Sequence, residues 1–187
     1  VNHYGWRTTT FILATGGVFV TLAAWFLIKD SPYRQTDLKN EQPKLIPSLK
    51  MIAQQPQIWL AAIVGGLLYL PISAFSELWA VPFLMSTYQI NSELASTANI
   101  MLFMGMALGG PLAAWLAKYY QNYVKVMQLS AITTALIFFG ISCAQYIPLS
   151  LMFGLLFAAG VTIGGQVLCF TCAKNNTTHE ISGTTVA

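Results

Sequence analysis

The feature that most constrains this chain is the near absence of charge from five long stretches of its sequence. Only 8% of its 187 residues are charged, whereas about a quarter are charged in a typical soluble domain. A helix that crosses a bilayer needs roughly 20 consecutive, mainly apolar residues. Five stretches meet this requirement, and we predict that each spans a membrane: about 8–28, 58–85, 95–117, 124–144 and 149–172.

The length and evenness of these stretches separate the two architectures that can cross a bilayer. Strands of a membrane barrel are about 10 residues long and alternate apolar with polar side chains. The stretches here are longer and do not alternate, so we predict an all-α, polytopic transmembrane helix bundle. A sixth helix is expected to begin near Ile181. Because the sequence starts at Val1 and stops inside this last run, we expect it to be a fragment of a longer membrane protein.

The loops between the predicted spans differ in their basic residues. The long polar segment 29–57 and the short loops 118–125 and 173–180 contain Lys or Arg, whereas the loops 86–93 and 145–148 contain neither. Loops rich in Lys and Arg stay on the cytoplasmic side of a membrane. We therefore predict that the first three segments are cytoplasmic and that the other two face outward.

Three observations argue against an enzyme, a metalloprotein or a nucleic-acid-binding protein. Cys169 and Cys172 form a C-x-x-C pair, a spacing used in metal and redox sites, but no second pair and no well-placed histidine accompanies them. We interpret them as packing residues and predict no metal and no cofactor. The predicted spans also contain no histidine and no catalytic motif, and no basic stripe suggests a nucleic-acid partner.

A single acid, Glu77, lies well inside a predicted span, about 7 Å to the outer side of its middle. An ionised carboxylate in hydrocarbon is costly, so such a residue faces the bundle interior, a partner or water. No Lys or Arg of the five spans is placed to pair with it. We expect either a partner elsewhere in the protein or a carboxyl group that binds a proton for part of the time. The alternative is a structural hydrogen bond near the outer end of the bundle.

Other polar residues complete a candidate pathway for a solute and protons. By helical spacing, three of them share a broad face with Glu77: Tyr69, Ser73 and Ser76. Two prolines, Pro71 and Pro82, are expected to interrupt the helix on either side, as in transporter helices that line cavities. Gln166 and Asn99 are the other deep polar groups, for which an interhelical hydrogen bond is the alternative role.

Glycines at four-residue spacing predict where helices pack closely. Gly105 and Gly109 form one such pair, and Gly160 and Gly164 form another. Small residues at this spacing let helix backbones approach one another in lipid. The motif is common in membrane bundles, so it predicts packing and does not identify a function.

Three segments, in order, resemble parts of the major facilitator superfamily. They are "YGWRTTTFILATGG" at 4–17, "GGPLAAWLAKYYQNYVKVM" at 109–127 and "EISGTTVA" at 180–187. They resemble the start of the sixth helix, the second-half copy of the family's cytoplasmic loop motif, and the start of the eleventh helix. One departure is Lys118, which stands where the loop motif usually has an acid.

The resemblance implies a domain organisation. Residues 1–28 would be the last helix of the N-terminal half, 29–57 the cytoplasmic central loop, and 58–187 a truncated C-terminal half. It also implies a secondary active transporter that moves a small solute by alternating access, with proton symport if Glu77 carries a proton. The expected partners are the solute, protons, the lipid bilayer and the N-terminal half of the chain, in the cell (inner) membrane. The alternative is a scaffold or receptor on the same fold without transport.

Overall fold

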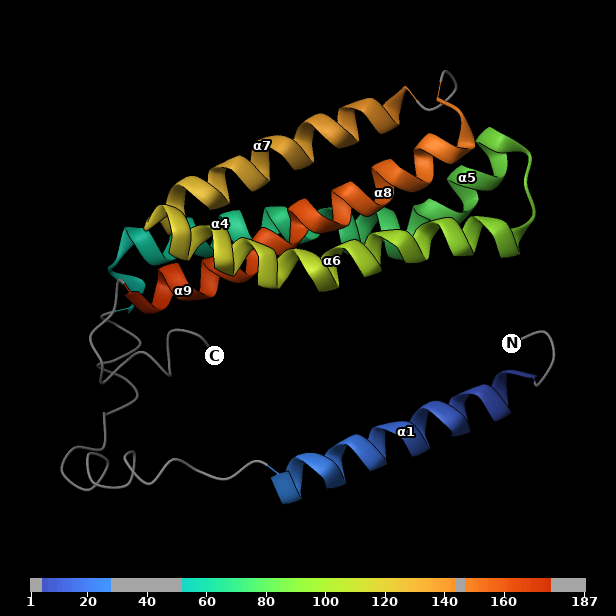
Figure 1. The fold of residues 1–187 in the computed structure, drawn as a ribbon, viewed down its shortest axis with the longest axis horizontal. Coiled ribbons are helices and arrows are strands. Elements are labelled where there is room, and N and C mark those ends of the chain that lie inside the picture. The colour runs from blue at the N-terminus through green and yellow to red at the C-terminus, as the bar shows by residue number, and fades with distance from the viewer. Residues whose placement is uncertain (1–4, 28–51, 144–146, 176–187) are drawn as a thin grey trace. The chain divides into compact units, whose positions relative to one another are not determined.

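The structure, a computed structural model, describes residues 5–27, 52–143 and 147–175, which are helical apart from short turns (Figure 1). In this part of the chain, five helical runs are long and apolar enough to cross a membrane: Gly5–Leu27, Pro56–Tyr88, Ser92–Tyr120, Tyr123–Ser142 and Leu149–Asn175. Each overlaps one predicted span, so the predicted all-α transmembrane architecture is confirmed. The predicted sixth helix and most of the long polar segment lie outside the described residues.

The chain divides into two compact units, Val1–Gln42 and Pro43–Ala187. The described part of the first is helix α1, Gly5–Leu27, which buries none of its residues. Four of its threonine hydroxyls donate to backbone carbonyls one turn back, as Thr15 does to Phe11 at 2.8 Å. A hydroxyl bonded within its own helix leaves no unmet hydrogen bond on an apolar surface, which suits a helix that lies in lipid.

The second run changes its helical geometry at a proline. It consists of α4 (Pro56–Leu70), the π-helical segment η1 (Pro71–Trp79) and α5 (Ala80–Tyr88). Pro71 lacks the N–H that an α-helix would use one turn back, and the chain takes wider π turns from this residue onward. Pro82, which was also expected to interrupt the helix, lies in the first turn of α5, and the helix continues through it to Tyr88.

Short connections join the next two helices, α6 (Ser92–Tyr120) and α7 (Tyr123–Ser142). Each begins at an asparagine cap: Asn91 Oδ1 accepts from the N–H of Leu94 at 2.9 Å, and Asn122 Oδ1 accepts from the N–H of Lys125 at 3.0 Å. These caps satisfy N–H groups that the first helical turn leaves without a partner. They allow α6 and α7 to start within a few residues of the preceding helix.

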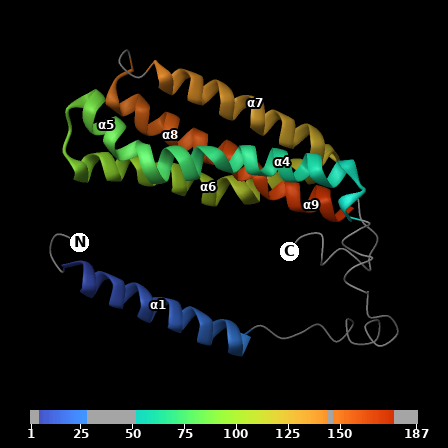
Figure 2. The same ribbon diagram turned by 180° about the vertical axis from the view of Figure 1, so that it is seen from behind.

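The fifth run also departs from α geometry near its middle. Helix α8 (Leu149–Ile163) passes through a short 3₁₀ turn, η3 (Gly164–Gln166), into α9 (Val167–Asn175). The 3₁₀ turn begins at two consecutive glycines, both buried. In Figures 1 and 2, α8 and α9 run along α6, while α4 lies beside α9.

The four predicted packing glycines all lie in one interface, between α6 and the α8–η3 run. A Cβ atom added to Gly105 or Gly109 would overlap the backbone of Phe157 or Val161. On the other helix, a Cβ added to Gly160 would overlap the backbone of Leu102, and one added to Gly164 would meet that of Gly109. The two glycine motifs therefore face each other, and the helices touch backbone to backbone.

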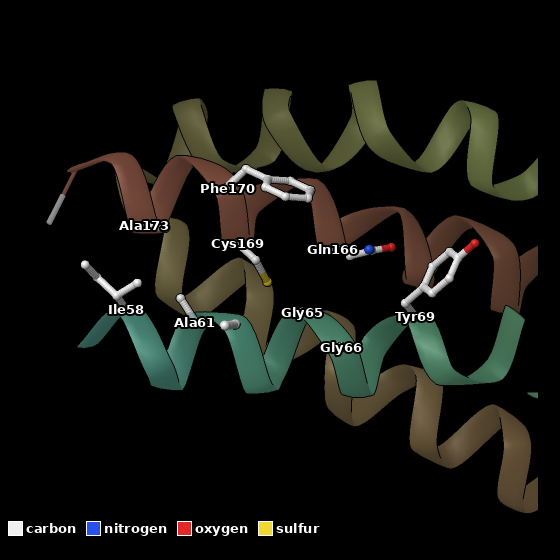
Figure 3. Close-up of a pocket in the computed structure, with 10 residues that line it drawn as sticks. Ile58, Ala61, Gly65, Gly66, Tyr69, Gln166, Cys169, Phe170 and Ala173 are labelled. Carbon is white, nitrogen blue, oxygen red and sulfur yellow. The ribbon is translucent and has the colours of Figure 1, made fainter. Parts of the chain in front are cut away.

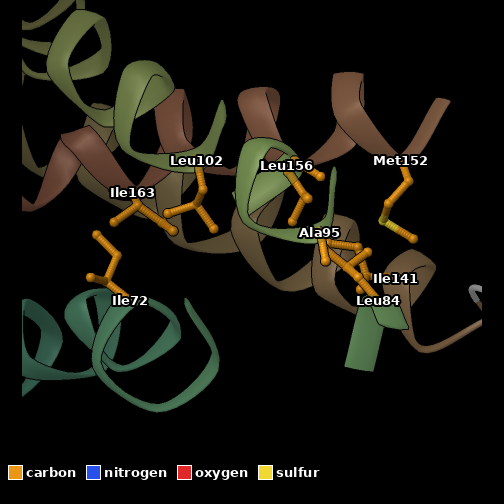
Figure 4. Packing of buried hydrophobic residues seen from close by; sticks show 9 residues of the cluster. Ile72, Leu84, Ala95, Leu102, Ile141, Met152, Leu156 and Ile163 are labelled. Atoms are coloured by element: carbon orange, nitrogen blue, oxygen red, sulfur yellow. The ribbon is translucent and has the colours of Figure 1, made fainter. Parts of the chain in front are cut away.

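Apolar side chains fill the space around this interface toward the end of the bundle where α6 and α8 begin. Figure 4 shows the cluster, which joins the second, third, fourth and fifth runs and includes Ile72, Leu84, Leu102, Met152, Leu156 and Ile163. In lipid, apolar side chains gain little from leaving their surroundings, so close packing is the main source of helix association. This core holds η1 and α5 against α6 and α8.

Candidate functional site

A pocket of about 320 Å³ lies between α4 and the η3–α9 run (Figure 3). Its α4 wall consists of residues spaced three or four apart: Ile58, Ala61, Ala62, Gly65, Gly66 and Tyr69. Its other wall follows the same spacing on the facing helix: Gln166, Cys169, Phe170 and Ala173. The pocket is therefore a space between two facing helices.

Small residues on α4 create this space. A Cβ atom added to Gly65 would lie 3.2 Å from Cys169 Cβ, so the two helices are close at that level. One added to Gly66 would meet nothing within 4 Å, so the absence of a side chain there leaves room. Gly66 and Tyr69 are exposed, and the pocket is open on their side.

The polar groups of the pocket come from Gln166 and Tyr69. Gln166 Oε1 is buried and has no hydrogen-bond partner among the described residues. Its carboxamide extends along the pocket toward the ring of Tyr69 (Figure 3). A buried acceptor without a donor costs about 1–3 kcal/mol. The site therefore contains a polar atom that a bound molecule could satisfy, and none of the side chains that line it is charged.

Both polar residues lie where a helix departs from α geometry. Tyr69 is in the last turn of α4, directly before the π-helical segment that begins at Pro71. Gln166 ends the 3₁₀ turn between α8 and α9. Irregular segments within membrane helices commonly form binding sites near the middle of the bilayer. The local breaks in the two helices thus occur beside the pocket.

Ser76 and Asn99, two further predicted pathway residues, bind each other instead of lining the pocket. The Ser76 hydroxyl donates to Asn99 Oδ1 at 2.8 Å, and Asn99 Nδ2 donates to the Ser76 backbone carbonyl at 2.9 Å. Ser76 is only 3% exposed. The pair ties η1 to α6, and each side chain meets part of the other's hydrogen-bonding need.

Glu77 and Ser73 belong to neither arrangement. Glu77 is exposed in the described part of the chain, and the Ser73 hydroxyl points back to the Leu70 carbonyl at 3.4 Å. The predicted common face of Tyr69, Ser73 and Glu77 does not extend to Ser76, which is buried against α6 while Glu77 is exposed. The expected face was too broad, because Ser76 and Glu77 are adjacent in sequence and their side chains point roughly 80–100° apart around the helix axis.

Cys169 was interpreted only as a packing residue, yet it also lines the pocket. Its Sγ lies 3.2 Å from Met127 Sδ, in a small buried cluster with Leu68. The three cysteines are free thiols, and the described residues include no cluster of three or more metal-ligating His, Cys, Asp or Glu side chains. Sequence reasoning also missed Gly65 and Gly66, although adjacent glycines inside an apolar span are a signal for space at a helix surface.

The comparisons with known proteins place the whole chain in one group. The model of the Major Facilitator Superfamily matches residues 1–187. Comparisons with curated proteins and with solved structures gave no match. The family match includes all three of the segments whose resemblance was noted from the sequence.

Proposed function

Because the chain belongs to the Major Facilitator Superfamily, a family of membrane transporters that are generally not enzymes, we propose that it is a secondary active transporter working by alternating access. The family and its five apolar helices make it an integral, multi-pass membrane protein. In this proposal a small solute occupies the pocket between α4 and the η3–α9 run. The remaining partners are lipid and, in the coupled form, protons.

The observation that carries the proposal is the position of the pocket between two locally irregular helices. Alternating access requires parts of the bundle to rock around a bound solute. α4 and α9 depart from regular α geometry immediately beside Tyr69 and Gln166. A change in bend at either place would alter the pocket, which couples occupation of the site to helix movement.

We further propose that transport is coupled to protons, and this coupling depends on Glu77. The other charged residues of the five helical runs lie near the ends of those runs, whereas Glu77 is well inside Pro56–Tyr88. Its carboxyl group forms no hydrogen bond or ion pair with the other described residues. A carboxylate at this depth is stabilised by water, by a partner or by a proton. We assign it the role of a proton-binding residue in symport.

The proposal includes a domain assignment and a location. Residues 1–28 form the last helix of the N-terminal half, 29–57 the cytoplasmic central loop, and 58–187 belong to the C-terminal half. The chain lies in the cell's inner membrane with the C-terminal end of α6 on the cytoplasmic side. In support, Trp115 stacks on Tyr119 with ring centroids 5.8 Å apart, next to exposed Lys118. Aromatic and basic residues together are typical of a membrane–water interface.

Uptake by vesicles tests transport directly. The full-length protein is reconstituted into liposomes, and the entry of a panel of radiolabelled small solutes is measured with and without an imposed proton gradient. We expect at least one solute to enter faster than into protein-free liposomes. Well-folded protein that moves none of the panel, yet binds a member of it, would favour the receptor or scaffold reading.

A further inference from the structure

The pocket between α4 and the η3–α9 run has a chemical character that restricts what it can bind. From it we infer that the solute is uncharged and largely apolar and carries at least one N–H or O–H group, which donates to Gln166 Oε1. This deepens the proposed transport function and rests on it, because a molecule that binds here is a substrate only if the protein moves it.

The lining residues argue against a charged ligand. They are apolar or small, except for Gln166 and Tyr69, and none carries a charge. Taking a charge out of water is costly unless an opposite charge or several hydrogen bonds compensate. Two neutral polar side chains do not supply such compensation, so a neutral solute is favoured over an ion.

The unpaired oxygen of Gln166 argues for a donor on the ligand. Oε1 can only accept a hydrogen bond, and it is buried without a partner among the described residues. Because this oxygen is already buried, an apolar solute that lacks a donor leaves it unsatisfied. A solute with an N–H or O–H group removes that penalty, and the Tyr69 hydroxyl can accept or donate a second hydrogen bond.

Size and hydration agree with a small organic ligand. The volume of about 320 Å³ is at the lower end of the range of roughly 300–1,000 Å³ for small-molecule sites. Water alone is a poor occupant, because a buried water makes about three hydrogen bonds and the walls offer few polar groups. The same walls favour a compact molecule with one polar end.

A thiol placed in the pocket can report its occupation. Gly66 is exposed, and a side chain there would meet nothing within 4 Å, so Gly66→Cys should not disturb the fold. The rate at which N-ethylmaleimide modifies this thiol in the full-length protein is followed by mass spectrometry of its peptide. The modification of the native thiols of Cys143, Cys169 and Cys172 is thereby measured separately from that of the introduced thiol. Gly154→Cys, on the exposed side of α8, also meets nothing within 4 Å and serves as the control.

Three probes of similar size separate the requirements: benzamide, N,N-dimethylbenzamide and benzoate. We expect benzamide to slow modification at Gly66→Cys, and the dimethylated amide, which has no N–H, to need about tenfold higher concentration. Benzoate should protect least, and none should protect Gly154→Cys. Equal protection by the two amides, stronger protection by benzoate, or no protection by any probe would overturn the inference.

A second variant ties the preference to Gln166. In Gly66→Cys with Gln166→Leu, the difference between the two amides should fall below about twofold, because the acceptor is gone. Gln166→Met, whose flexible side chain fits more readily, provides the same comparison if the leucine variant does not fold. A tenfold preference that persists in the variant that folds would also overturn the inference.

Vesicle flux separates this inference from the transport proposal. Protection of the expected pattern without flux of labelled benzamide or any panel solute would refute transport and leave the binding site in place. Flux of a panel solute without the expected protection would uphold transport and refute the solute class.

Discussion

The Ser76 hydroxyl lies 2.8 Å from Asn99 Oδ1, and Asn99 Nδ2 lies 2.9 Å from the Ser76 carbonyl, so the two residues are joined twice. One of these bonds uses a backbone carbonyl within a π-helical segment. The pair therefore connects the irregular part of the second span to helix α6.

Removing Asn99 should cost more stability than removing the Ser76 hydroxyl. Asn99→Ala deletes both bonds and leaves a buried carbonyl with fewer partners, at about 1–3 kcal/mol. Ser76→Ala deletes one bond, and single polar contacts in membrane bundles average about 0.6 kcal/mol. Thermal unfolding of the full-length protein in detergent measures both changes. Ser73→Ala, whose hydroxyl bonds only within its own helix, is the control and should change little.

Substitution of Gly109 should disrupt the contact between α6 and α8. A Cβ at Gly109 would overlap the Val161 backbone, whereas one at neighbouring Gly110 would meet only a Val167 methyl at 3.7 Å. Gly109→Ala should lower stability by about 1–3 kcal/mol, and Gly109→Leu by more. Gly110→Ala should be neutral or stabilising, since alanine favours a helix. The test is the yield and melting temperature of each variant; equal values for both alanine variants would contradict the interface.

Replacement of Glu77 tests the proton-binding role. Glu77→Gln should preserve the fold, because a neutral amide of similar shape is less costly in a membrane than a carboxylate. It should abolish accumulation driven by a proton gradient while exchange of substrate across the membrane continues. Both are measured in the same vesicles. Accumulation at the wild-type level in Glu77→Gln would exclude Glu77 as the coupling residue.

Labelling in intact cells tests the orientation of the bundle. Ser92→Cys at the start of α6 should react with an impermeant maleimide from outside, and Lys125→Cys at the start of α7 only after the membrane is opened. Both positions are exposed. Cys143→Ala removes the exposed native thiol first. Reaction of Lys125→Cys from outside would reverse the assignment.

The helical runs were predictable because length and the exclusion of charge alone define a membrane span. At most of their ends, the described runs extend a few residues beyond the predicted spans. Polar caps such as Asn91 add helical turns that hydropathy does not detect. The glycine motifs were visible as well. The two motifs face each other because of the tertiary arrangement, and the spacing of glycines within one helix does not identify the helix that packs against it.

The site was less predictable than the spans. Tyr69 and Gln166 were both named from the sequence, but nothing in their spacing placed them across one pocket. The grouping of Ser76 with Glu77 failed because adjacent helical residues point roughly 80–100° apart, and only Ser76 meets Asn99 of α6. Pocket walls made by Gly65 and Gly66 were not predicted, because an absent side chain leaves little trace in a hydropathy pattern.

The backbone contact between α6 and α8 has a consequence for movement. Opposed glycines fit in one register, and a slide of either helix by a residue would bring a side chain against a backbone that has no room for it. These two helices should therefore move together as one rigid body. Any conformational change in this part of the protein then involves the helices that are held by side-chain contacts. Above all, α4 would move relative to the α6–α8 pair.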